Sequence, residues 1–151
     1  MAFNLSNRSR GKLEGVHPDM VAVVERAIEL TKVDFGVTYG VRTVEEQEKL
    51  VASGRSQTMK SKHLTGDAVD VVAYIGSRIS WELNLYDDIA DAFKEASVRE
   101  GVGIKWGASW HIPDLRDWEG TAEEAMNAYI DLRRSQNRRP FIDSPHFELI
   151  T

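Results

Sequence analysis

The chain contains no cysteine among its 151 residues. Disulfides, thiolate metal sites and cysteine nucleophiles are therefore excluded, whereas the redox compartment stays open. The opening residues, MAFNLSNRSR, lack the apolar stretch of a secretory signal. No run approaches the ~18 apolar residues that a membrane span needs. We therefore expect a protein that is made in the cytoplasm, does not insert into membranes, and needs another exit route for any extracellular task.

Excess positive charge is also missing. The chain has 19 Lys and Arg residues and 24 Asp and Glu residues, which gives a net charge of −5. Such a balance gives no overall field that favours nucleic acid, so we expect no nucleic-acid partner. Local basic clusters do occur near the start and late in the chain, at Arg8, Arg10 and Lys12 and at Arg133, Arg134, Arg138 and Arg139. We interpret both as solvated faces, with attraction to an anionic polymer such as a cell wall as the alternative.

The composition is that of a globular protein, with 42% hydrophobic and 28% charged residues. The length suits one domain, and no repeat or Pro/Gly/Ser linker divides the chain. We therefore expect a single domain over residues 1–151.

Apolar periodicity and capping sequences predict four helices and four short strands. Thr43-Val-Glu-Glu46 and Thr121-Ala-Glu-Glu124 are capping boxes, and Ser80 and Gly101 are expected to cap and close the third helix. The expected helices are 18–31, 43–54, 81–100 and 121–135, and the expected strands are 35–39, 67–74, 103–106 and 145–150. Helices and short strands mixed in this order predict an α+β fold, with a small, largely antiparallel sheet packed with helices.

Two segments, Ser61-Lys-His-Leu-Thr-Gly-Asp-Ala-Val-Asp70 and Asp143-Ser-Pro-His-Phe-Glu-Leu149, hold residue types that bind metals. Gly66 can turn the backbone sharply between His63 and Asp70. Asp70 lies in a valine-rich strand, where a carboxylate needs a partner, either a metal or a salt bridge. Two imidazoles and one carboxylate suit zinc, and three protein ligands leave a fourth position for water, as catalytic sites require.

The complete pattern, Ser-x-His-x-x-Gly-x-Ala-x-Asp followed late by Asp-x-x-His, resembles the zinc D-alanyl-D-alanine carboxypeptidase and L-alanyl-D-glutamate endopeptidase family. The similarity extends over most of the chain and favours the phage endolysin branch. It rests on Gly15-Val-His-Pro-Asp19, Tyr39-Gly-Val-Arg-Thr43 with Glu46 and Gln47, Ser61–Asp70, Trp106-Gly-Ala-Ser-Trp110 and Pro145-His-Phe-Glu-Leu149. The resemblance implies the zinc peptidase fold of the D-Ala-D-Ala carboxypeptidase/hedgehog type.

By this resemblance His63, Asp70 and His146 are expected to bind Zn²⁺, and Asp143 is expected to act as the general base. Zinc lowers the pKa of bound water to about 7 and polarises a carbonyl. Asp143, close in sequence to a ligand, is placed to take a proton from that water and pass it to the leaving amine. A turn or cap aspartate is the alternative for Asp143.

Arg42 and Ser61 match family positions near the substrate. The guanidinium of Arg42 would bind a substrate carboxylate or brace the polarised carbonyl, with an ion pair to Glu45 or Glu46 as the alternative. Ser61 is expected to contact substrate, with a turn or cap role as the alternative.

Aromatic and acidic residues beside these motifs receive separate interpretations. Trp110 is a candidate for lining the substrate groove, although tryptophan is also a common core residue. Trp106 is expected in the core. Glu148 alternates with Phe147 and Leu149, so we expect it to face away from them and to be structural.

One departure from the family pattern is the 32-residue segment 111–142 between Trp110 and Asp143. We interpret it as an insertion, which is a lid, a wall-binding element or a tolerated surface excursion. It carries His111, a competing metal ligand, but the family pattern favours His63 and His146 over His111 and His17.

The resemblance implies a phage endolysin that hydrolyses the L-alanyl-D-glutamate bond of peptidoglycan peptide stems during host lysis. A monomer is expected in the host cytoplasm, acting on the wall in the periplasm after release through a holin. The alternatives are a D-alanyl-D-alanine carboxypeptidase and a binding module that holds peptidoglycan without cleaving it.

Overall fold

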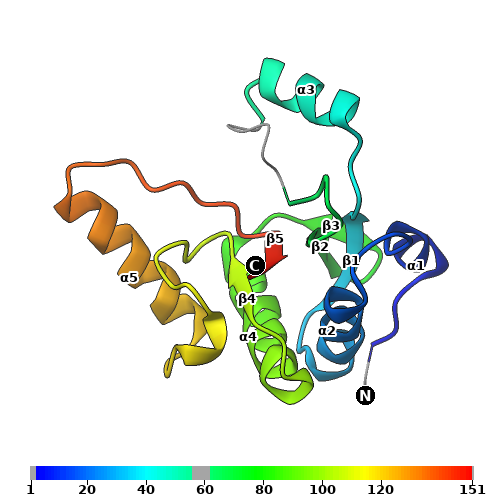
Figure 1. Cartoon of the computed structure of the whole chain (residues 1–151). Helices are drawn as coiled ribbons and strands as arrows, with labels where there is room; N and C mark the ends of the chain where they lie inside the picture. Colours follow the sequence, from blue (N-terminus) through cyan, green and yellow to red (C-terminus); the bar gives the residue numbers. More distant parts are fainter. Residues whose placement is uncertain (1–2, 56–61, 151) are drawn as a thin grey trace.

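The computed structural model describes residues 3–55 and 62–150, which form helices around a small sheet (Figure 1). In chain order the elements are α1 (Asn7–Lys12), α2 (Pro18–Leu30), β1 (Asp34–Tyr39), α3 (Val44–Ala52), β2 (Ala68–Ile75), β3 (Arg78–Ser80), α4 (Leu83–Glu100), β4 (Ile104–Trp106), the 3-10 turn η1 (Leu115–Asp117), α5 (Ala122–Ser135) and β5 (His146–Leu149).

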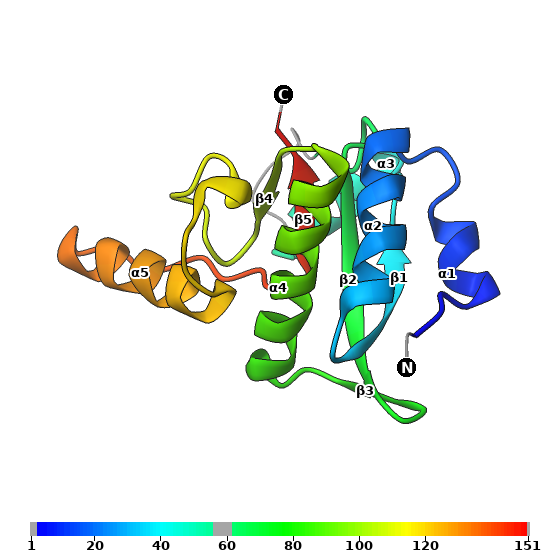
Figure 2. The ribbon, with the colours of Figure 1, turned by 90° about the horizontal axis from the view of Figure 1, so that it is seen from below.

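The strands form one antiparallel sheet in the order β1-β2-β5-β4, with β3 paired to the far end of β2. Helices α2 and α4 run side by side across one face of this sheet (Figure 2). Helix α5 packs against α4 on the outer side, and α3 stands away from these helices, beyond the sheet. The predicted α+β fold with an antiparallel sheet is therefore confirmed.

All eight predicted helices and strands are present, and their ends differ from the predicted ones by at most two residues. Both capping boxes form, because the hydroxyls of Thr43 and Thr121 accept from the backbone three residues on and the glutamates reach back. Gly101 ends α4 in the left-handed conformation at φ 68°. Among the described residues, no helix is both long enough and apolar enough to cross a membrane.

The prediction that Ser80 caps the third helix is wrong. Ser80 lies in β3, and α4 begins at Leu83 after Glu82, which makes no side-chain capping bond. The short hairpin that turns at Gly76, with φ 62°, places Ser80 opposite Ala73 instead. There its carbonyl accepts from the Tyr86 hydroxyl at 2.9 Å. Sequence periodicity also missed α1, β3 and η1, which are too short to show a repeating apolar pattern.

Side-chain alternation divides the sheet into an apolar face and a polar face. Val69, Val71 and Ala73 of β2 join the hydrophobic core under α2 and α4. Phe147 of β5 is fully buried there and stacks on Phe93 of α4, with ring centroids 3.9 Å apart. Trp106 is also fully buried and lies nearly parallel to Phe147, which confirms its predicted place in the core. The residues between these positions consequently face the other side of the sheet.

A buried carboxyl group lies where α4 meets α5. The Asp87 residue is only 7% exposed, and its Oδ1 has no hydrogen-bond partner among the described residues. Burial, followed by the negative charges of Glu123, Asp88 and Asp91, raises the pKa of Asp87 to about 6. The folded protein therefore binds this proton more tightly than the unfolded chain does, so ionisation of Asp87 destabilises the fold as pH rises from about 4 to 6.

We expect Asp87→Asn, which mimics the protonated carboxyl, to raise the free energy of unfolding at pH 7.5 by about 1–3 kcal/mol. The gain should vanish at pH 4, where Asp87 is protonated in the folded wild type. Urea unfolding at both pH values measures the difference, with the exposed Asp131→Asn on α5 as control. An equal gain at pH 4 would show that ionisation of Asp87 is not the cause.

Candidate metal centre

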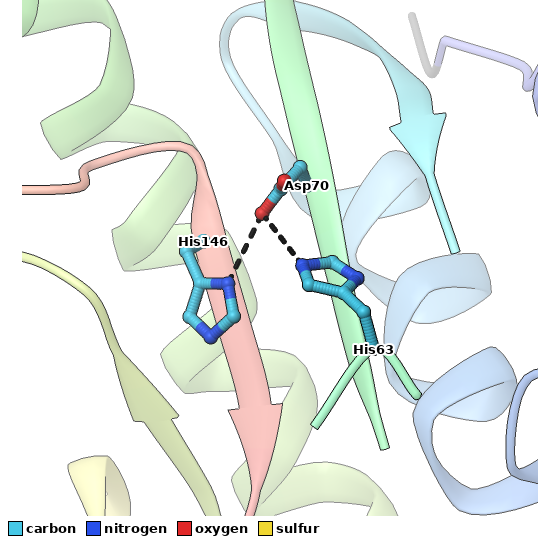
Figure 3. Close-up of side chains that lie close together, drawn as sticks. All are labelled: His63, Asp70 and His146. Carbon is cyan, nitrogen blue, oxygen red and sulfur yellow. Dashed lines mark hydrogen bonds and ion pairs between the residues drawn. The ribbon is translucent and has the colours of Figure 1, made fainter. Parts of the chain in front are cut away.

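His63, Asp70 and His146 converge on the polar side of the sheet (Figure 3). One potential ligand atom from each lies within 4.8 Å of the other two. Asp70 Oδ1 lies 3.2 Å from His63 Nε2 and 3.1 Å from His146 Nδ1. Asp70 and His146 are directly opposed in the β2–β5 ladder, which places their side chains next to each other on one face.

His63 comes from the loop before β2 and is held by its backbone. Its carbonyl accepts from the Arg42 amide at 2.9 Å, and the following turn is closed by Gly66. Gly66 has φ +79°, and a Cβ there would lie 2.7 Å from the Gly15 carbonyl oxygen. Its own carbonyl accepts from the His17 amide at 2.8 Å. The sharp turn predicted at Gly66 is thus present, and it directs His63 toward β2.

The hydrogen bonds around the two imidazoles fix which nitrogen faces Asp70. His63 Nδ1 lies 2.8 Å from the Gly40 carbonyl, which can only accept, so this nitrogen carries the proton. His146 Nε2 likewise lies 2.8 Å from Glu148 Oε1. The remaining nitrogens, His63 Nε2 and His146 Nδ1, therefore face the shared Asp70 oxygen, where each can donate a proton to Asp70 or, once deprotonated, bind a cation.

Asp70 is supported on its second oxygen by Arg42. Arg42 Nη2 lies 3.3 Å from Asp70 Oδ2, and Nη1 donates to Gln47 Oε1 at 2.8 Å. The Arg42 side chain is only 10% exposed, and its cation lies 5.5 Å from the centroid of the Tyr39 ring.

The predicted alternative for Arg42, an ion pair with a glutamate of α3, does not form among the described residues. Glu45 instead pairs with Lys49, and Glu46 caps Thr43. Arg42 therefore holds the central carboxylate.

The pKa shifts show how strongly the three groups interact. Burial alone would raise the pKa of Asp70, but hydrogen bonds from His146 and His63, with their positive charges, lower it well below its usual range. Burial alone would lower the pKa of His146, but the hydrogen bonds to Asp70 and Glu148 raise it to about 9. Carboxylates thus surround His146 so closely that they favour a positive charge at this position.

Asp143 sits at the start of the turn that leads into β5. Its amide donates to the Gly107 carbonyl at 2.8 Å, and its carbonyl accepts from the His146 amide at 3.0 Å. A Cβ at Gly107 would lie 2.2 Å from the Asp143 carbonyl oxygen, so this close approach requires glycine. Burial first, and then the charge of Asp70, raise the pKa of Asp143, while His146, His63 and Arg42 partly oppose the shift. Asp143 therefore lies within the electrostatic field of the cluster.

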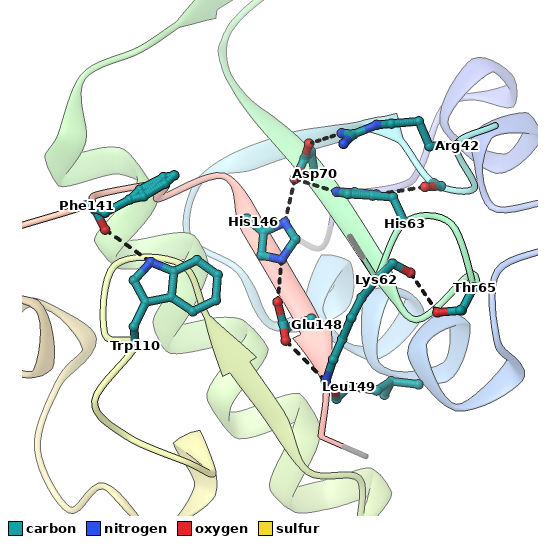
Figure 4. Close-up of polar contacts among 11 residues, drawn as sticks. Arg42, Lys62, His63, Thr65, Asp70, Trp110, Phe141, His146, Glu148 and Leu149 are labelled. Atoms are coloured by element: carbon teal, nitrogen blue, oxygen red, sulfur yellow. Dashed lines mark hydrogen bonds and ion pairs between the residues drawn. The ribbon is translucent and has the colours of Figure 1, made fainter. Parts of the chain in front are cut away.

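Trp110 lies beside the cluster on the side of the segment that leads into β5 (Figure 4). Its ring centroid is 5.6 Å from that of His146, and its Nε1 donates to the Phe141 carbonyl at 3.1 Å. Trp110 also stacks on Phe141, and it is only partly buried. The structure thus places Trp110 next to His146, a potential ligand, and its predicted contact with substrate stays a prediction.

The remaining candidates lie elsewhere. His111 contacts Trp118 and Tyr129, and burial lowers its pKa. His17 caps α2 by accepting from the Asp19 amide. Among the described residues neither belongs to the metal-binding group, in agreement with the preference for His63 and His146. Ser61 lies outside the described residues.

Glu148 has a closer relation to the site than the sequence indicated. It does face away from Phe147 and Leu149, as predicted, but that direction brings it to His146, two residues earlier on the same face of β5. Its other oxygen lies 3.2 Å from Lys62 Nζ, which also donates to the Leu149 carbonyl at 2.6 Å. Lys62 precedes His63, so this contact joins the segments that carry the two histidines (Figure 4). The i, i+2 spacing from His146 was the sequence signal for Glu148, whereas nothing local indicated Lys62.

The arrangement can bind one cation through two imidazole nitrogens and a carboxylate oxygen. Asp143 lies in the same electrostatic field, and its side chain makes no hydrogen bond or ion pair with the described residues. A metal held beside an available carboxylate is the usual combination for hydrolysis by an activated water.

Comparison with known proteins agrees with this geometry. Residues 1–150 match the family described as phage L-alanyl-D-glutamate peptidase. The L-alanyl-D-glutamate peptidase of Escherichia phage T5 is 36% identical over 115 residues, which cover 74% of this chain and 84% of the phage T5 protein. The protein of the same name from Listeria phage A118 is 37% identical over 70 residues, 46% of this chain and 24% of that protein.

A solved structure shares the fold along nearly the whole chain. The crystal structure of the Serratia marcescens L-Ala D-Glu endopeptidase ChiX superposes with a TM-score of 0.71 at 34% identity. The match covers 97% of this chain and 90% of that one. Together with the match over residues 1–150, this shows that the chain belongs to the phage L-alanyl-D-glutamate peptidase family.

Proposed function

We propose that this protein is a zinc-dependent peptidoglycan peptidase that hydrolyses the L-alanyl-D-glutamate bond of cell-wall peptide stems. Membership of a peptidase family supports the reaction class. The metal assignment rests on three potential ligand atoms, from two imidazoles and the Asp70 carboxylate, that lie within 4.8 Å of one another. The other nitrogen of each imidazole already has a hydrogen-bond partner.

The donor set fits zinc. Two imidazole nitrogens, neutral once the metal displaces the proton that His146 otherwise holds, and one carboxylate oxygen match its borderline preference. Three protein ligands leave one coordination position open. We assign His63 Nε2, Asp70 and His146 Nδ1 as these ligands. When bound, zinc supplies a Lewis acid that activates water and polarises the scissile carbonyl.

The surrounding residues have separate roles in this proposal. Asp143 accepts a proton from the attacking water and delivers it to the amine of the leaving peptide, and its raised pKa suits both directions of transfer. Arg42 orients Asp70 through the ion pair at 3.3 Å and adds positive charge where the carbonyl oxygen becomes negative. Trp110 lines the groove, because its ring flanks His146.

Further parts of the proposal concern the whole chain and the cell. We propose one peptidase domain over residues 1–151, with 111–142 as an addition that packs on α4 through α5. Ser61 contacts substrate in this proposal. The protein acts as a monomer on the cell wall of a phage host after release through a holin.

The products of cell-wall digestion test the proposed reaction. We expect mass spectrometry of digested muropeptides to show fragments that begin with D-glutamate, and EDTA to prevent their formation. Release of single D-alanine residues would identify a D-alanyl-D-alanine carboxypeptidase instead. Wall binding without any cleavage would identify a binding module.

Substitutions separate the metal ligands from the proposed base. His63→Ala should lose stoichiometric zinc and activity together, because two ligands hold zinc poorly. Asp143→Ala should keep one zinc per chain yet lose about 10²–10⁴-fold in kcat, the usual contribution of a general base. Zinc content by mass spectrometry and initial rates on purified muropeptide measure both. Full activity in Asp143→Ala would remove it from the reaction, and retained zinc in His63→Ala would reject that ligand.

The contact of Lys62 with Glu148 should tune zinc binding, since partners of ligating histidines fix their orientation. We expect Glu148→Ala to weaken zinc affinity by about 10–100-fold. Lys62→Met, which keeps the aliphatic stem, should weaken it less, because the His146–Glu148 bond survives. Competition with a fluorescent chelator measures zinc affinity. The matched control is Lys49→Met, which removes a lysine from an exposed ion pair with Glu45. Unchanged affinity in Glu148→Ala would show that His146 does not need this acceptor.

A further inference from the structure

A cluster of unneutralised arginines lies at the end of α5, in a segment that we name the arginine turn (residues 133–139). It contains Arg133, Arg134, Arg138 and Arg139, and residues 132–142 include no acidic residue. This local excess of four positive charges contrasts with the net charge of −5 for the chain.

Within the part of the chain that the structure describes, these four arginines have no carboxylate partner; Arg8, Arg55 and Arg78 have none either, but they are not neighbours of one another in the sequence. Elsewhere five arginines pair with Asp or Glu side chains, namely Arg10, Arg26, Arg42, Arg99 and Arg116. Within residues 3–55 and 62–150, the arginine turn takes part in no ion pair, and Arg134, Arg138 and Arg139 are exposed. The helix dipole favours cations in the last turn of α5, which accounts for Arg133 and Arg134. It does not account for Arg138 and Arg139, which lie beyond the helix.

The arginine turn has a defined backbone. Asn137 adopts the left-handed conformation at φ 60°, and the Arg138 amide donates to the Arg133 carbonyl at 2.8 Å. The Arg133 guanidinium donates twice to the Arg139 carbonyl, at 3.3 and 3.2 Å. Arg133 therefore closes the turn, and the other three guanidiniums project from a fixed frame.

A short and anchored segment connects the arginine turn to the metal centre. Phe141 donates its amide to the Tyr129 hydroxyl at 3.2 Å and stacks on Trp110, which in turn flanks His146. Asp143 follows Arg139 by four residues, so the chain separates their Cα atoms by at most about 14 Å. In Figure 1 this segment leads directly from α5 to β5. A bound peptide of five residues would span a similar distance.

We propose that the arginine turn is a docking surface for the free carboxylates of peptidoglycan peptide stems, separate from the metal centre. Planar guanidiniums bind carboxylates through paired hydrogen bonds, and a glutamate linked through one carboxyl keeps the other free. Several weak contacts to a polymer with repeated carboxylates add up by avidity, which raises the local concentration of stems at the metal centre. This inference rests on the proposed function for the identity of the polymer.

The test compares binding and cleavage in two sets of charge variants. The triple variant Arg134→Gln, Arg138→Gln and Arg139→Gln spares Arg133, whose side chain closes the turn. The matched control Arg8→Gln, Arg10→Gln and Lys12→Gln removes three charges from α1. Melting temperatures should stay close to that of the wild type, since exposed substitutions change stability little.

We expect the arginine-turn variant to bind purified sacculi about tenfold more weakly at 50 mM salt, and the control to bind within twofold of the wild type. The deficit should shrink at 0.5 M salt, where screening weakens the wild type as well. On a soluble muropeptide with one stem, kcat/KM should stay within twofold, because no second stem is present. Unchanged sacculus binding, or an equal loss in the control, would overturn the proposal. A loss confined to vesicles of anionic phospholipid would overturn it too, in favour of a membrane partner.

The outcomes also separate this inference from the proposed function. Charge-dependent sacculus binding without cleavage of any muropeptide would refute the peptidase and keep the docking surface. If muropeptides are cleaved but the arginine-turn variant binds sacculi as tightly as the wild type, only the docking surface is refuted.

Discussion

The site depends on one carboxylate oxygen, Asp70 Oδ1, which two imidazoles share at 3.2 and 3.1 Å. This contact requires Asp70 of β2 and His146 of β5 to be opposed in the ladder, and the loop before β2 to bring His63 back over the same face. A shift of the β2–β5 register by one residue would turn Asp70 or His146 into the hydrophobic core. The core residues Val69, Val71 and Phe147 therefore fix the metal centre by fixing the register.

The charges around this contact favour positive charge there. Asp70, Asp143 and Glu148 bring three carboxylates close to the two histidines, whereas Arg42 and Lys62 bring two cationic side chains. Carboxylates buried in this way are costly unless positive charge meets them. The raised pKa of His146 also shows that the carboxylates favour positive charge here, because the protonated imidazole stabilises them. The contacts of Gly40 with His63 and of Glu148 with His146 leave His63 Nε2 and His146 Nδ1 as the nitrogens that face Asp70.

Much of this arrangement was predictable from sequence because it is encoded locally. Capping boxes at Thr43 and Thr121, and the alternation around Asp70, gave the elements and the face of the strand. The motif resemblance gave His63, Asp70 and His146 as a group, and the structure brings them together.

What sequence missed depends on contacts between distant residues or on the backbone. Lys62 contacts Glu148, which lies 86 positions later in the sequence. The partner of His63 Nδ1 is the backbone carbonyl of Gly40, and because every residue has a carbonyl the sequence does not single this one out. Ser80 was misassigned because a serine before an apolar run suits both a cap and the short strand it occupies. For Arg42 the sequence suggested a substrate contact or, as the alternative, an ion pair with glutamates of α3, and neither indicated its contact with Asp70 of β2.

Anomalous diffraction at the zinc absorption edge, from crystals of the zinc-loaded protein, tests the central claim most directly. We expect one peak per chain, about 2.0–2.2 Å from His63 Nε2, His146 Nδ1 and an oxygen of Asp70, with no fourth protein ligand. A peak at His146 Nε2, a peak elsewhere in the chain, or a site closed by a fourth side chain would contradict the account.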